Sequence, residues 1–327
     1  MKKIAVFTSG GDAPGMNACI RAVVRSSLYF GKEAVGIYRG YQGMVDADFW
    51  EMNAHSVSNI LHLGGTILRS ARCAAFRTPE GRKLAYDNLK AAGIDGIVAI
   101  GGDGTCTGAN VFINEYPDIK MIACPGTIDN DLVGTDFTIG YDTAINTAMD
   151  AIDKIKDTAN AHDRLFFVEV MGRDAGFIAL NAGMATGAEA ILIPENVSTM
   201  EELINALEVS FEKKKNSSIV VVAEGDEMGG ALKIMKELKK RSFDRYEMRV
   251  SILGHMQRGG RPTCLERVRA SRMGVAAVKA LIEGRSGEMI GIVNDKIQYT
   301  PFEKAIKSHQ PINPEFEDAV NILSKIV

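Results

Sequence analysis

Short apolar runs without polar interruption recur along this chain, and they constrain its fold more than any other feature. Half-exposed strands alternate apolar with polar residues, whereas strands buried on both faces of a mostly parallel sheet do not. The sequence therefore predicts buried parallel strands. These runs are Ile4 to Thr8, Gly96 to Ile100, Met121 to Cys124, Phe166 to Val170, Ala190 to Ile193 and Ile219 to Ala223.

Helical stretches separate these runs and give the βαβ alternation of layered α/β folds. A chain of 327 residues exceeds the usual span of one domain, so we expect two lobes. The predicted architecture is a mostly parallel sheet in each lobe, sandwiched by helices. The expected helices include Asn17 to Phe30, Arg82 to Ala92, Thr143 to Thr158 and Met200 to Lys214.

Composition narrows the classes of protein to consider. With 46% apolar and 24% charged residues and a net charge of -3, the chain gives no reason to expect a nucleic-acid or membrane partner. Its five cysteines are odd in number and form no CxxC pair, which disfavours a disulfide framework and a zinc site. The first apolar run is too short for a signal peptide. We therefore expect a cytoplasmic protein with reduced thiols.

Three glycine clusters follow predicted strands, which is where open α/β sheets place ligands. The first, SGGDAPGMN at Ser9 to Asn17, lets backbone amides approach a phosphate in front of a helix N-terminus. A tight strand-to-helix turn capped by Asp12 is an alternative for this cluster taken alone.

The second cluster, GGDGT at Gly101 to Thr105, places a carboxylate among three glycines directly behind a buried strand. Asp103 could hold Mg²⁺ while the glycines leave room for phosphates. A structural turn would not need this composition. The cluster is neither a Walker A loop nor a GxGxxG dinucleotide fingerprint, so it indicates a different phosphate cradle.

The third cluster, PGTIDND at Pro125 to Asp131, presents two carboxylates and an asparagine on a short loop. Such a loop could supply a general base for a hydroxyl nucleophile, although a capped turn uses the same residue types. Phosphoryl transfer needs a phosphate cradle and a base together, and their combination favours this chemistry.

Together with SAR at Ser70 to Arg72, MGRDAG at Met171 to Gly176 and GHMQRGG at Gly254 to Gly260, these clusters closely resemble the bacterial ATP-dependent 6-phosphofructokinases, end to end and in the family's order. The resemblance implies a glycolytic kinase with its active site in a cleft between two lobes. It implies an ATP-binding lobe of residues 1–138 plus 254–303 and a sugar-phosphate lobe of residues 139–253 plus 304–327.

The resemblance also implies the nucleotide site, with Asp103 on the magnesium ion and ATP as co-substrate. Cys73 stands where the family often has an aromatic residue. Arg72 and Arg173 are the expected stabilisers of transition-state charge. The residues expected to line the ATP site are Gly11, Arg72, Cys73, Gly102, Asp103, Gly104 and Thr105.

On the acceptor side, the resemblance implies that Asp129 takes the proton from the C1 hydroxyl of fructose 6-phosphate. Arg164 and Arg249 match arginines that reach the 6-phosphate from a neighbouring subunit, which implies a homotetramer with a shared site. The expected substrate contacts are Thr127, Ile128, Asp129, Arg164, Met171, Gly172, Arg173, Glu224, Arg249, His255, Met256, Gln257 and Arg258.

The phosphoryl donor can be judged from two positions. Pyrophosphate-dependent relatives usually carry aspartate after the GGD and lysine in place of Gly126, and this chain has glycine at both. A carboxylate at position 104 would repel the α-phosphate of a nucleotide, so Gly104 favours ATP. The alternatives are a pyrophosphate-dependent phosphofructokinase, a kinase of another sugar phosphate, and a nucleotide sensor without turnover. Kinases of NAD or lipids would not need the PGTIDND loop.

The family's effector pocket, for ADP or phosphoenolpyruvate, is matched only in part. Ala54 and Lys156 stand where arginines are common, and Asn216 replaces a lysine. Lysine cannot reproduce the planar fork of arginine on a phosphate, so we expect a weakened or altered effector response. The residues expected to form the pocket are Arg21, Arg25, Lys156, Gly187, Glu189, Lys213 and Lys215.

Overall fold

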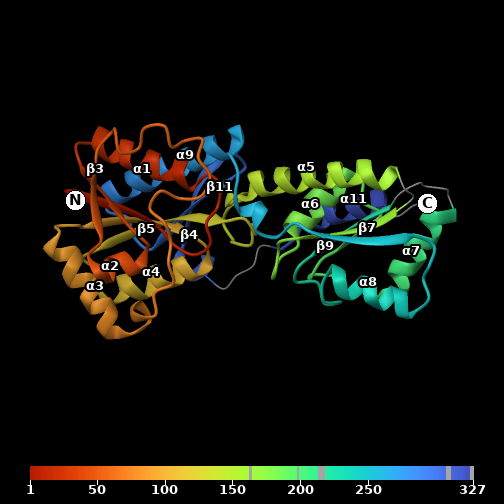
Figure 1. Ribbon diagram of the computed structural model, residues 1–327. Helices are drawn as coiled ribbons and strands as arrows, with labels where there is room; N and C mark the ends of the chain where they lie inside the picture. The colour runs from red at the N-terminus through yellow and green to blue at the C-terminus, as the bar shows by residue number, and fades with distance from the viewer. Residues whose placement is uncertain (162–163, 197–198, 213–217, 307–310, 325–327) are drawn as a thin grey trace. The chain divides into compact units, whose positions relative to one another are not determined.

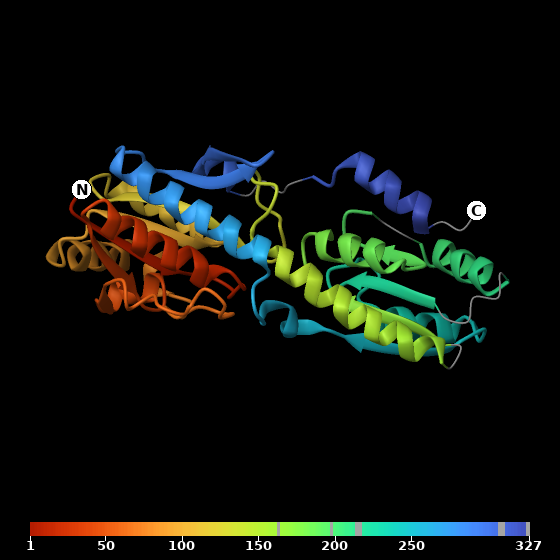
Figure 2. The ribbon, with the colours of Figure 1, turned by 90° about the horizontal axis from the view of Figure 1, so that it is seen from above.

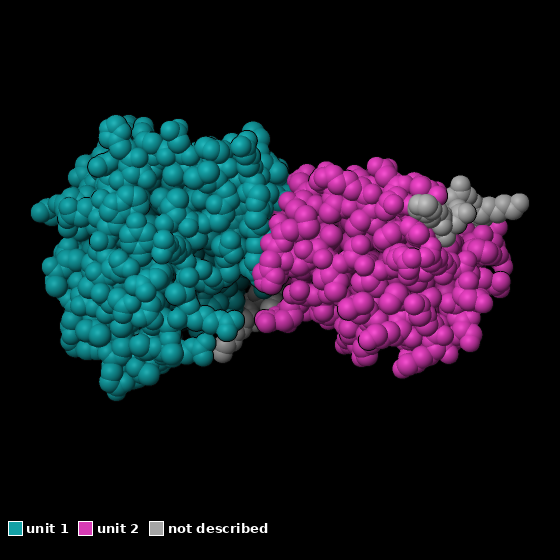
Figure 3. All heavy atoms as spheres, viewed as in Figure 1, with its two compact units in different colours: residues 1–143, 258–310 teal, residues 144–257, 311–327 magenta. Residues whose placement is uncertain are grey.

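The computed structural model describes residues 1–161, 164–196, 199–212, 218–306 and 311–324. The chain forms two compact units (Figure 3). Each unit has its own sheet. Unit 1 consists of Met1–Thr143 and Arg258–Gln310, and unit 2 of Ala144–Gln257 and Pro311–Val327. The lobe limits given above were assigned by expected ligand rather than by packing, and they stay a prediction.

The sheet of unit 1 runs in the order β12-β11-β5-β4-β1-β2-β3, with β6 paired to the end of β5 (Figure 1). Its centre is parallel, and the pairs β2–β3 and β11–β12 are antiparallel. The strands are β1 Lys3–Thr8, β2 Glu33–Ile37, β3 Phe49–Met52, β4 Gly96–Gly101, β5 Lys120–Thr127, β6 Ile139–Gly140, β11 Glu288–Val293 and β12 Lys296–Pro301.

Helices cover both faces of this sheet, with α1 and α9 packed together on one face and α2, α3 and α4 on the other (Figure 1). They are α1 Met16–Tyr29, α2 Tyr41–Asp46, α3 Pro79–Ala91, α4 Asp103–Glu115, α9 Cys264–Ile282 and α10 Phe302–Ala305, with a 3₁₀ turn at Ala75–Arg77.

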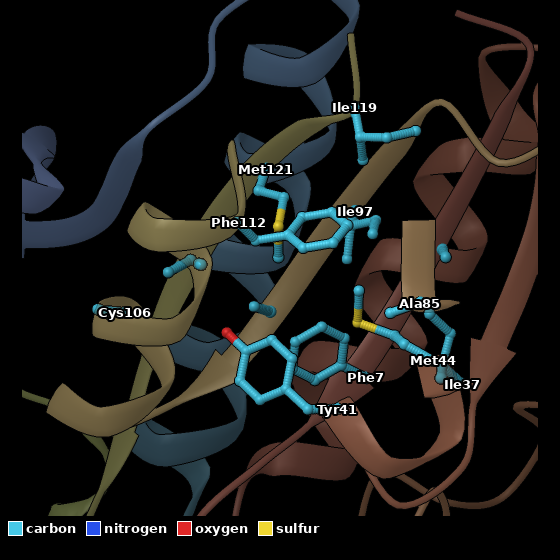
Figure 4. Packing of buried hydrophobic residues seen from close by; sticks show 14 of the residues in the cluster. Phe7, Ile37, Tyr41, Met44, Ala85, Ile97, Cys106, Phe112, Ile119 and Met121 are labelled. Atoms are coloured by element: carbon cyan, nitrogen blue, oxygen red, sulfur yellow. The ribbon is translucent and has the colours of Figure 1, made fainter. Parts of the chain in front are cut away.

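The apolar core of unit 1 reaches the second glycine cluster through one side chain. Tyr41 packs against Phe7 and Phe76 in this core (Figure 4). Its hydroxyl donates to the carbonyl oxygen of Thr105 at 2.6 Å, and burial raises the pKa of this phenol well above its ordinary value. The GGDGT cluster is therefore anchored to the core.

The sheet of unit 2 is parallel throughout, in the order β10-β7-β9-β8. Helices α5, α6 and α11 lie on one face and α7 and α8 on the other (Figures 1 and 2). The elements are α5 Tyr141–Asn160, β7 Arg164–Val170, α6 Phe177–Thr186, β8 Ala190–Leu192, α7 Met200–Glu212, β9 Ser218–Ala223, α8 Ala231–Lys240, β10 Glu247–Ile252, a 3₁₀ turn at Gly254–Arg258 and α11 Pro314–Ser324.

The predicted α/β class and parallel sheets are confirmed. The helix expected from Arg82 begins earlier, at Pro79, because the Thr78 hydroxyl accepts from the Gly81 amide and caps it. Six strands were not among the runs named above: β2, β3, β6, β10, β11 and β12. Of these, β3, β10 and β12 lie at sheet edges, whereas β2 and β11 lie inside the sheet. Among the described residues, no helix is long and apolar enough to cross a membrane.

Candidate active site

The three glycine clusters of unit 1 follow β1, β4 and β5, which are neighbours in the sheet. The first two interlock, since the Ser9 amide donates to the Ile100 carbonyl oxygen at 2.9 Å. A Cβ added at Gly101 would lie 2.5 Å from the backbone oxygen of Ser9 and 2.3 Å from the Thr105 hydroxyl oxygen. Glycine at position 101 is thus required by close packing.

The GGDGT cluster continues directly into α4, whose first turn contains Asp103. Gly104 is exposed, and a Cβ added there would meet no atom within 4 Å. A helix N-terminus directs backbone amides and the positive end of the helix dipole at an anion, and open space at Gly104 lets a phosphate approach. These features fit a nucleotide phosphate.

The ligand set at this turn also fits Mg²⁺. No group of three or more His, Cys, Asp or Glu side chains that could hold a metal occurs in the part of the chain that the structure describes. Mg²⁺ at phosphate-transfer sites is commonly held by one or two carboxylates, the substrate phosphates and water. Asp103 beside a phosphate cradle matches that mode.

The PGTIDND loop is held by its own hydrogen bonds. The Asp129 amide donates to the Thr127 hydroxyl at 3.2 Å, and the Thr138 hydroxyl donates to the Thr127 carbonyl oxygen at 2.6 Å. Asn130, at a positive φ of 55°, donates to the Asp136 carbonyl oxygen and accepts from the Thr138 amide. Asp129 is half buried on this fixed loop.

Ile128, a predicted substrate contact, is 1% exposed, so its whole residue lies buried beneath the loop surface. Gly126, one of the two positions used above to judge the phosphoryl donor, is also packed tightly, since a Cβ there would lie 3.0 Å from Met16 and 3.1 Å from the Gly101 amide nitrogen. A lysine at position 126 would require the neighbouring residues to shift, whereas a side chain added at position 104 would meet open space.

The SAR segment approaches the first glycine cluster, since the Ser70 hydroxyl donates to the Gly10 carbonyl oxygen at 2.9 Å. Arg72 is exposed there, and the half-buried Cys73 accepts from the Phe76 amide at 3.4 Å. Arg258 is an expected substrate contact, and its guanidinium lies over Gly11, where an added Cβ would sit 1.9 Å from Nη1. Unit 1 thus brings Arg258 to an expected nucleotide contact.

In unit 2, the motifs MGRDAG, AEG and GHMQ follow the carboxyl ends of β7, β9 and β10, which are adjacent strands. The Gly225 amide donates to the Gly172 carbonyl oxygen at 3.2 Å, so the first two motifs touch. The Met171 amide donates to the Gln257 side chain at 3.3 Å, and Gln257 is fully buried. Glu224, His255 and Met256 are exposed.

The arginines of unit 2 pair with nearby carboxylates. Arg164 donates to Glu247 at 2.8 Å, and Arg249 pairs with the other oxygen of the same carboxylate. Arg173, whose side chain is 80% exposed, pairs with Asp174 at 2.9 Å. Glu247 was not predicted from the sequence, because its pairing with Arg164 follows from the register of β7 and β10, which the sequence does not reveal.

Of the expected effector residues, Arg21 and Arg25 lie on α1 of unit 1, and Lys156, Gly187 and Glu189 belong to unit 2. Lys156 donates to the Thr186 carbonyl oxygen at 2.7 Å and lies beside Gly187 at the end of α6. Its ammonium therefore already stabilises a helix C-terminus. Lys213, Lys215 and Asn216 lie outside the described residues.

Glu266 was also missed, although the sequence carries a signal. TCLE at Thr263 to Glu266 has the spacing of a capping box, in which the glutamate reaches back to its own helix. Thr263 does cap α9, but the Glu266 carboxylate instead accepts from the amides of Gly140 and Thr143, at 2.8 and 3.2 Å. Burial raises the pKa of this carboxyl to about 7.

Comparisons with known proteins agree with this arrangement. The family model for phosphofructokinase matches residues 3–281. The chain is 55% identical over 326 residues to ATP-dependent 6-phosphofructokinase 2 of Bacteroides thetaiotaomicron, covering 100% of this chain and 98% of that one. It is 52% identical over 313 residues to ATP-dependent 6-phosphofructokinase 1 of Thermus thermophilus, covering 96% of each.

The fold matches a solved structure of phosphofructokinase from Saccharomyces cerevisiae with a TM-score of 0.90 and 35% identity. That match covers 98% of this chain and 50% of the yeast chain, so this chain spans half the length of that structural relative. With a family model over most of its length and relatives above half identity, the chain belongs to the phosphofructokinase family.

Proposed function

We propose that this protein transfers the γ-phosphoryl group of MgATP to the C1 hydroxyl of fructose 6-phosphate, giving fructose 1,6-bisphosphate and ADP. The observation that carries this proposal is the meeting of three glycine-rich turns at the ends of adjacent strands β1, β4 and β5, with Asp103 on one turn and Asp129 on the next. The relatives named as ATP-dependent 6-phosphofructokinases support the choice of donor and acceptor.

The nucleotide would bind to unit 1, with its phosphates at the start of α4 and its magnesium ion on Asp103. Bound Mg²⁺ neutralises charge on the phosphate oxygens. Gly102, Gly104 and Thr105 would present backbone to the phosphates, and the open space at Gly104 supports this contact. Gly11, Arg72 and Cys73 would complete the site.

Asp129 would act as general base on the acceptor hydroxyl. Its loop is fixed through Thr127 and Asn130, so the carboxylate can be held in one orientation. As the C1 oxygen attacks the γ-phosphorus, the O–H bond breaks and its proton passes to Asp129, while the β–γ bridging oxygen leaves with ADP. Positioned proton transfer typically contributes about 10²- to 10⁴-fold.

Most of the remaining rate would come from charge stabilisation and alignment. Arg72 and Arg173 are exposed and long enough to turn toward transferring oxygens. Arg173 would exchange its pairing with Asp174 for the phosphoryl group.

Fructose 6-phosphate would bind the motifs at the ends of β7, β9 and β10, through Met171, Gly172, Glu224, His255 and Arg258. Arg164 and Arg249 would contact the 6-phosphate of a neighbouring subunit, so the proposal includes a homotetramer. We also propose a cytoplasmic location, which is supported by the odd number of cysteines in the sequence and by their spacing, which is not that of a disulfide framework. The lobe assignments by ligand given above belong to this proposal.

The test is a coupled assay of the purified protein with Mg²⁺, offering ATP or pyrophosphate as donor and fructose 6-phosphate or another hexose phosphate as acceptor. We expect turnover with ATP and fructose 6-phosphate and little with pyrophosphate. Turnover with pyrophosphate alone would overturn the donor, and a preference for another sugar phosphate would overturn the acceptor. Nucleotide binding without turnover would leave the sensor function.

A weakened effector response is a further part of the proposal. Lys156 supplies one ammonium in place of an arginine fork, and this ammonium is engaged by α6. Titration of initial rates with ADP at a subsaturating fructose 6-phosphate concentration is expected to give little activation. Strong activation would contradict this expectation.

A further inference from the structure

Glu266 is a buried carboxylate to which the proposed reaction assigns no role. The residue is 2% exposed, although it belongs to the first turn of a helix, α9. Buried carboxylates are rare unless their oxygens accept hydrogen bonds. The partners of Glu266 are therefore informative about its purpose.

All these partners lie more than 100 residues away in the sequence, where β6 continues directly into α5. One carboxylate oxygen accepts from the Gly140 amide at 2.8 Å. The other accepts from the Thr143 amide at 3.2 Å and from the Thr143 hydroxyl at 3.3 Å. Glu266 thus ties α9 to the first turn of another helix.

A second set of hydrogen bonds, made by Thr263, also links the start of α9 to the start of α5. The Thr263 amide donates to the Thr143 hydroxyl oxygen at 3.2 Å, and the Thr263 hydroxyl pairs with Asp142. The Thr263 hydroxyl oxygen also accepts from the Glu266 amide at 3.1 Å. Asp142 is the neighbouring charged group that acts on Glu266, and it repels the carboxylate.

The tied segment supports the loop that carries Asp129. Gly140 pairs with Thr127 in the β5–β6 register, and the Thr138 hydroxyl donates to the Thr127 carbonyl oxygen. A Cβ added at Gly140 would lie 2.5 Å from Ala13 and 3.1 Å from Ile128. Displacement of Gly140 must therefore disturb both the first glycine cluster and the base loop.

Glu266 also contacts the first glycine cluster directly. A Cβ added at Gly15 would lie 2.9 Å from Cγ of Glu266 and 3.2 Å from Oε1. Gly15 has a φ of 109°, which favours glycine in any case, and the close approach leaves no room for a side chain. One buried carboxylate thus lies where two loops of the proposed site and the start of α5 meet.

We propose that Glu266 is a positioning residue, whose carboxylate fixes the Asp129 loop by holding Gly140 and Thr143 in place. This inference rests on the proposed function for its effect on rate. A small misplacement of a reacting group can cost about 10²-fold in rate, so a buried tie beneath the loop can control turnover without touching substrate.

Three variants separate this role from simple stabilisation of the fold. Glu266→Gln keeps the shape but presents an NH₂ group to one of the donors that the carboxylate satisfies. Glu266→Asp keeps the charge on a shorter stem. The matched control is Glu115→Gln, which breaks a bidentate pair with Arg82 at the far end of α4, about 18 Å along the helix from Asp103.

Two measurements are made on each variant at a temperature where circular dichroism shows it to be folded. For Glu266→Gln we expect kcat to fall by about 10- to 100-fold, with the KM for ATP changed by less than about threefold. We also expect faster hydrogen exchange of the Asp129 and Thr138 amides. Glu266→Asp should recover part of kcat, and Glu115→Gln should leave both measurements unchanged.

The exchange measurement keeps the two proposals distinct. A wild-type protein inactive with ATP and fructose 6-phosphate would overturn the proposed function, and exchange of the loop amides would still decide the role of Glu266. Unchanged loop exchange in Glu266→Gln would overturn the positioning role, whatever the activity. A kcat within about twofold of wild type, with exchange accelerated, would also overturn it.

Discussion

The two units present their candidate residues in different ways. In unit 1 the glycine-rich turns are fixed by backbone and buried groups, as in the contacts of Gly101 and Glu266. In unit 2 the expected anion contacts are arginines that pair with Glu247 and Asp174. In the proposed function, a nucleotide would thus meet a preformed backbone cradle, whereas a sugar phosphate would displace carboxylates from side chains.

The candidate site of unit 1 thus depends on backbone geometry, and that of unit 2 depends on charged side chains. Backbone amides at a helix start need no reorganisation, so changes in unit 1 should act through packing and space. Exposed ion pairs typically contribute about 0–1 kcal/mol, so exchanging them for a phosphate costs little.

The largest expected effect is on the pH dependence of unit 1 stability. Burial raises the pKa of Glu266 to about 7 in the folded protein, above its ordinary value of 4.5. The folded state thus holds this proton more tightly, and its stability falls as pH rises from about 4.5 to 7, by about 3 kcal/mol. Denaturant unfolding followed through Trp50, the single tryptophan, which lies in β3 of unit 1, measures this dependence.

Glu266→Gln removes this titrating group and is expected to show a flatter pH dependence over the same range. The pKa of Glu115 is lowered because Arg82 donates hydrogen bonds to its carboxylate, so Glu115 stays ionised from about pH 5 to about pH 7. The variant Glu115→Gln should therefore keep the wild-type slope of stability against pH over this range. An equal slope in wild type and Glu266→Gln would show that another group carries the dependence.

The next effect compares two glycines of one cluster. Gly101→Ala would place a methyl group against the Ser9 backbone, whereas Gly104→Ala would place it in open space. We expect Gly101→Ala to destabilise unit 1 by about 1–3 kcal/mol and Gly104→Ala to change stability by less than about 0.5 kcal/mol. Thermal unfolding followed through Trp50 would contradict this contrast if both variants matched wild type.

A charge at the same open position should weaken ATP use without harming the fold. We expect Gly104→Asp to lower kcat/KM for ATP by about tenfold, because like charges about 4 Å apart repel by about 1 kcal/mol or more. Gly104→Ala separates charge from size. Steady-state kinetics with equal losses in the two variants would show that space, rather than charge, determines the effect.

The smallest effect belongs to unit 2. Removing the charge of Glu247 by Glu247→Gln frees Arg164 and Arg249 from their shared partner. We expect the KM for fructose 6-phosphate to fall by about threefold, within the range of an exposed ion pair. Glu237→Gln, which removes the carboxylate partner of Lys240 and one of the two carboxylate partners of Arg241 at the end of α8, is the matched control. A raised KM in Glu247→Gln would mean that Glu247 orients the arginines.

Much of the fold could be predicted because its signals are local. An uninterrupted apolar run such as Gly96 to Ile100 forms a buried central strand. A glycine that follows it, such as Gly101, is required because the backbone there packs too closely for a side chain. The edge strand β12 alternates exposed and half-buried residues and lacks such a run. Strand β12 is placed by its antiparallel pairing with β11 at the edge of the sheet, and this pairing is a tertiary contact.

The site was predicted unevenly for the same reason. The glycine clusters and Asp129 can be recognised from their neighbours in the sequence. The role proposed for Glu266 depends on its hydrogen bond with Gly140, which lies 126 residues away in the sequence. The packing of Arg258 over Gly11 likewise depends on the tertiary fold, which brings chain segments together that composition and spacing cannot relate.

The central claim is that Asp129 takes the proton of the acceptor hydroxyl, and the kcat of Asp129→Asn tests it most directly. With ATP, Mg²⁺ and fructose 6-phosphate in a coupled assay, the variant is expected to lose about 10²-fold or more in kcat while its KM for ATP stays close to wild type. A kcat within about threefold of wild type would contradict the assignment of the base.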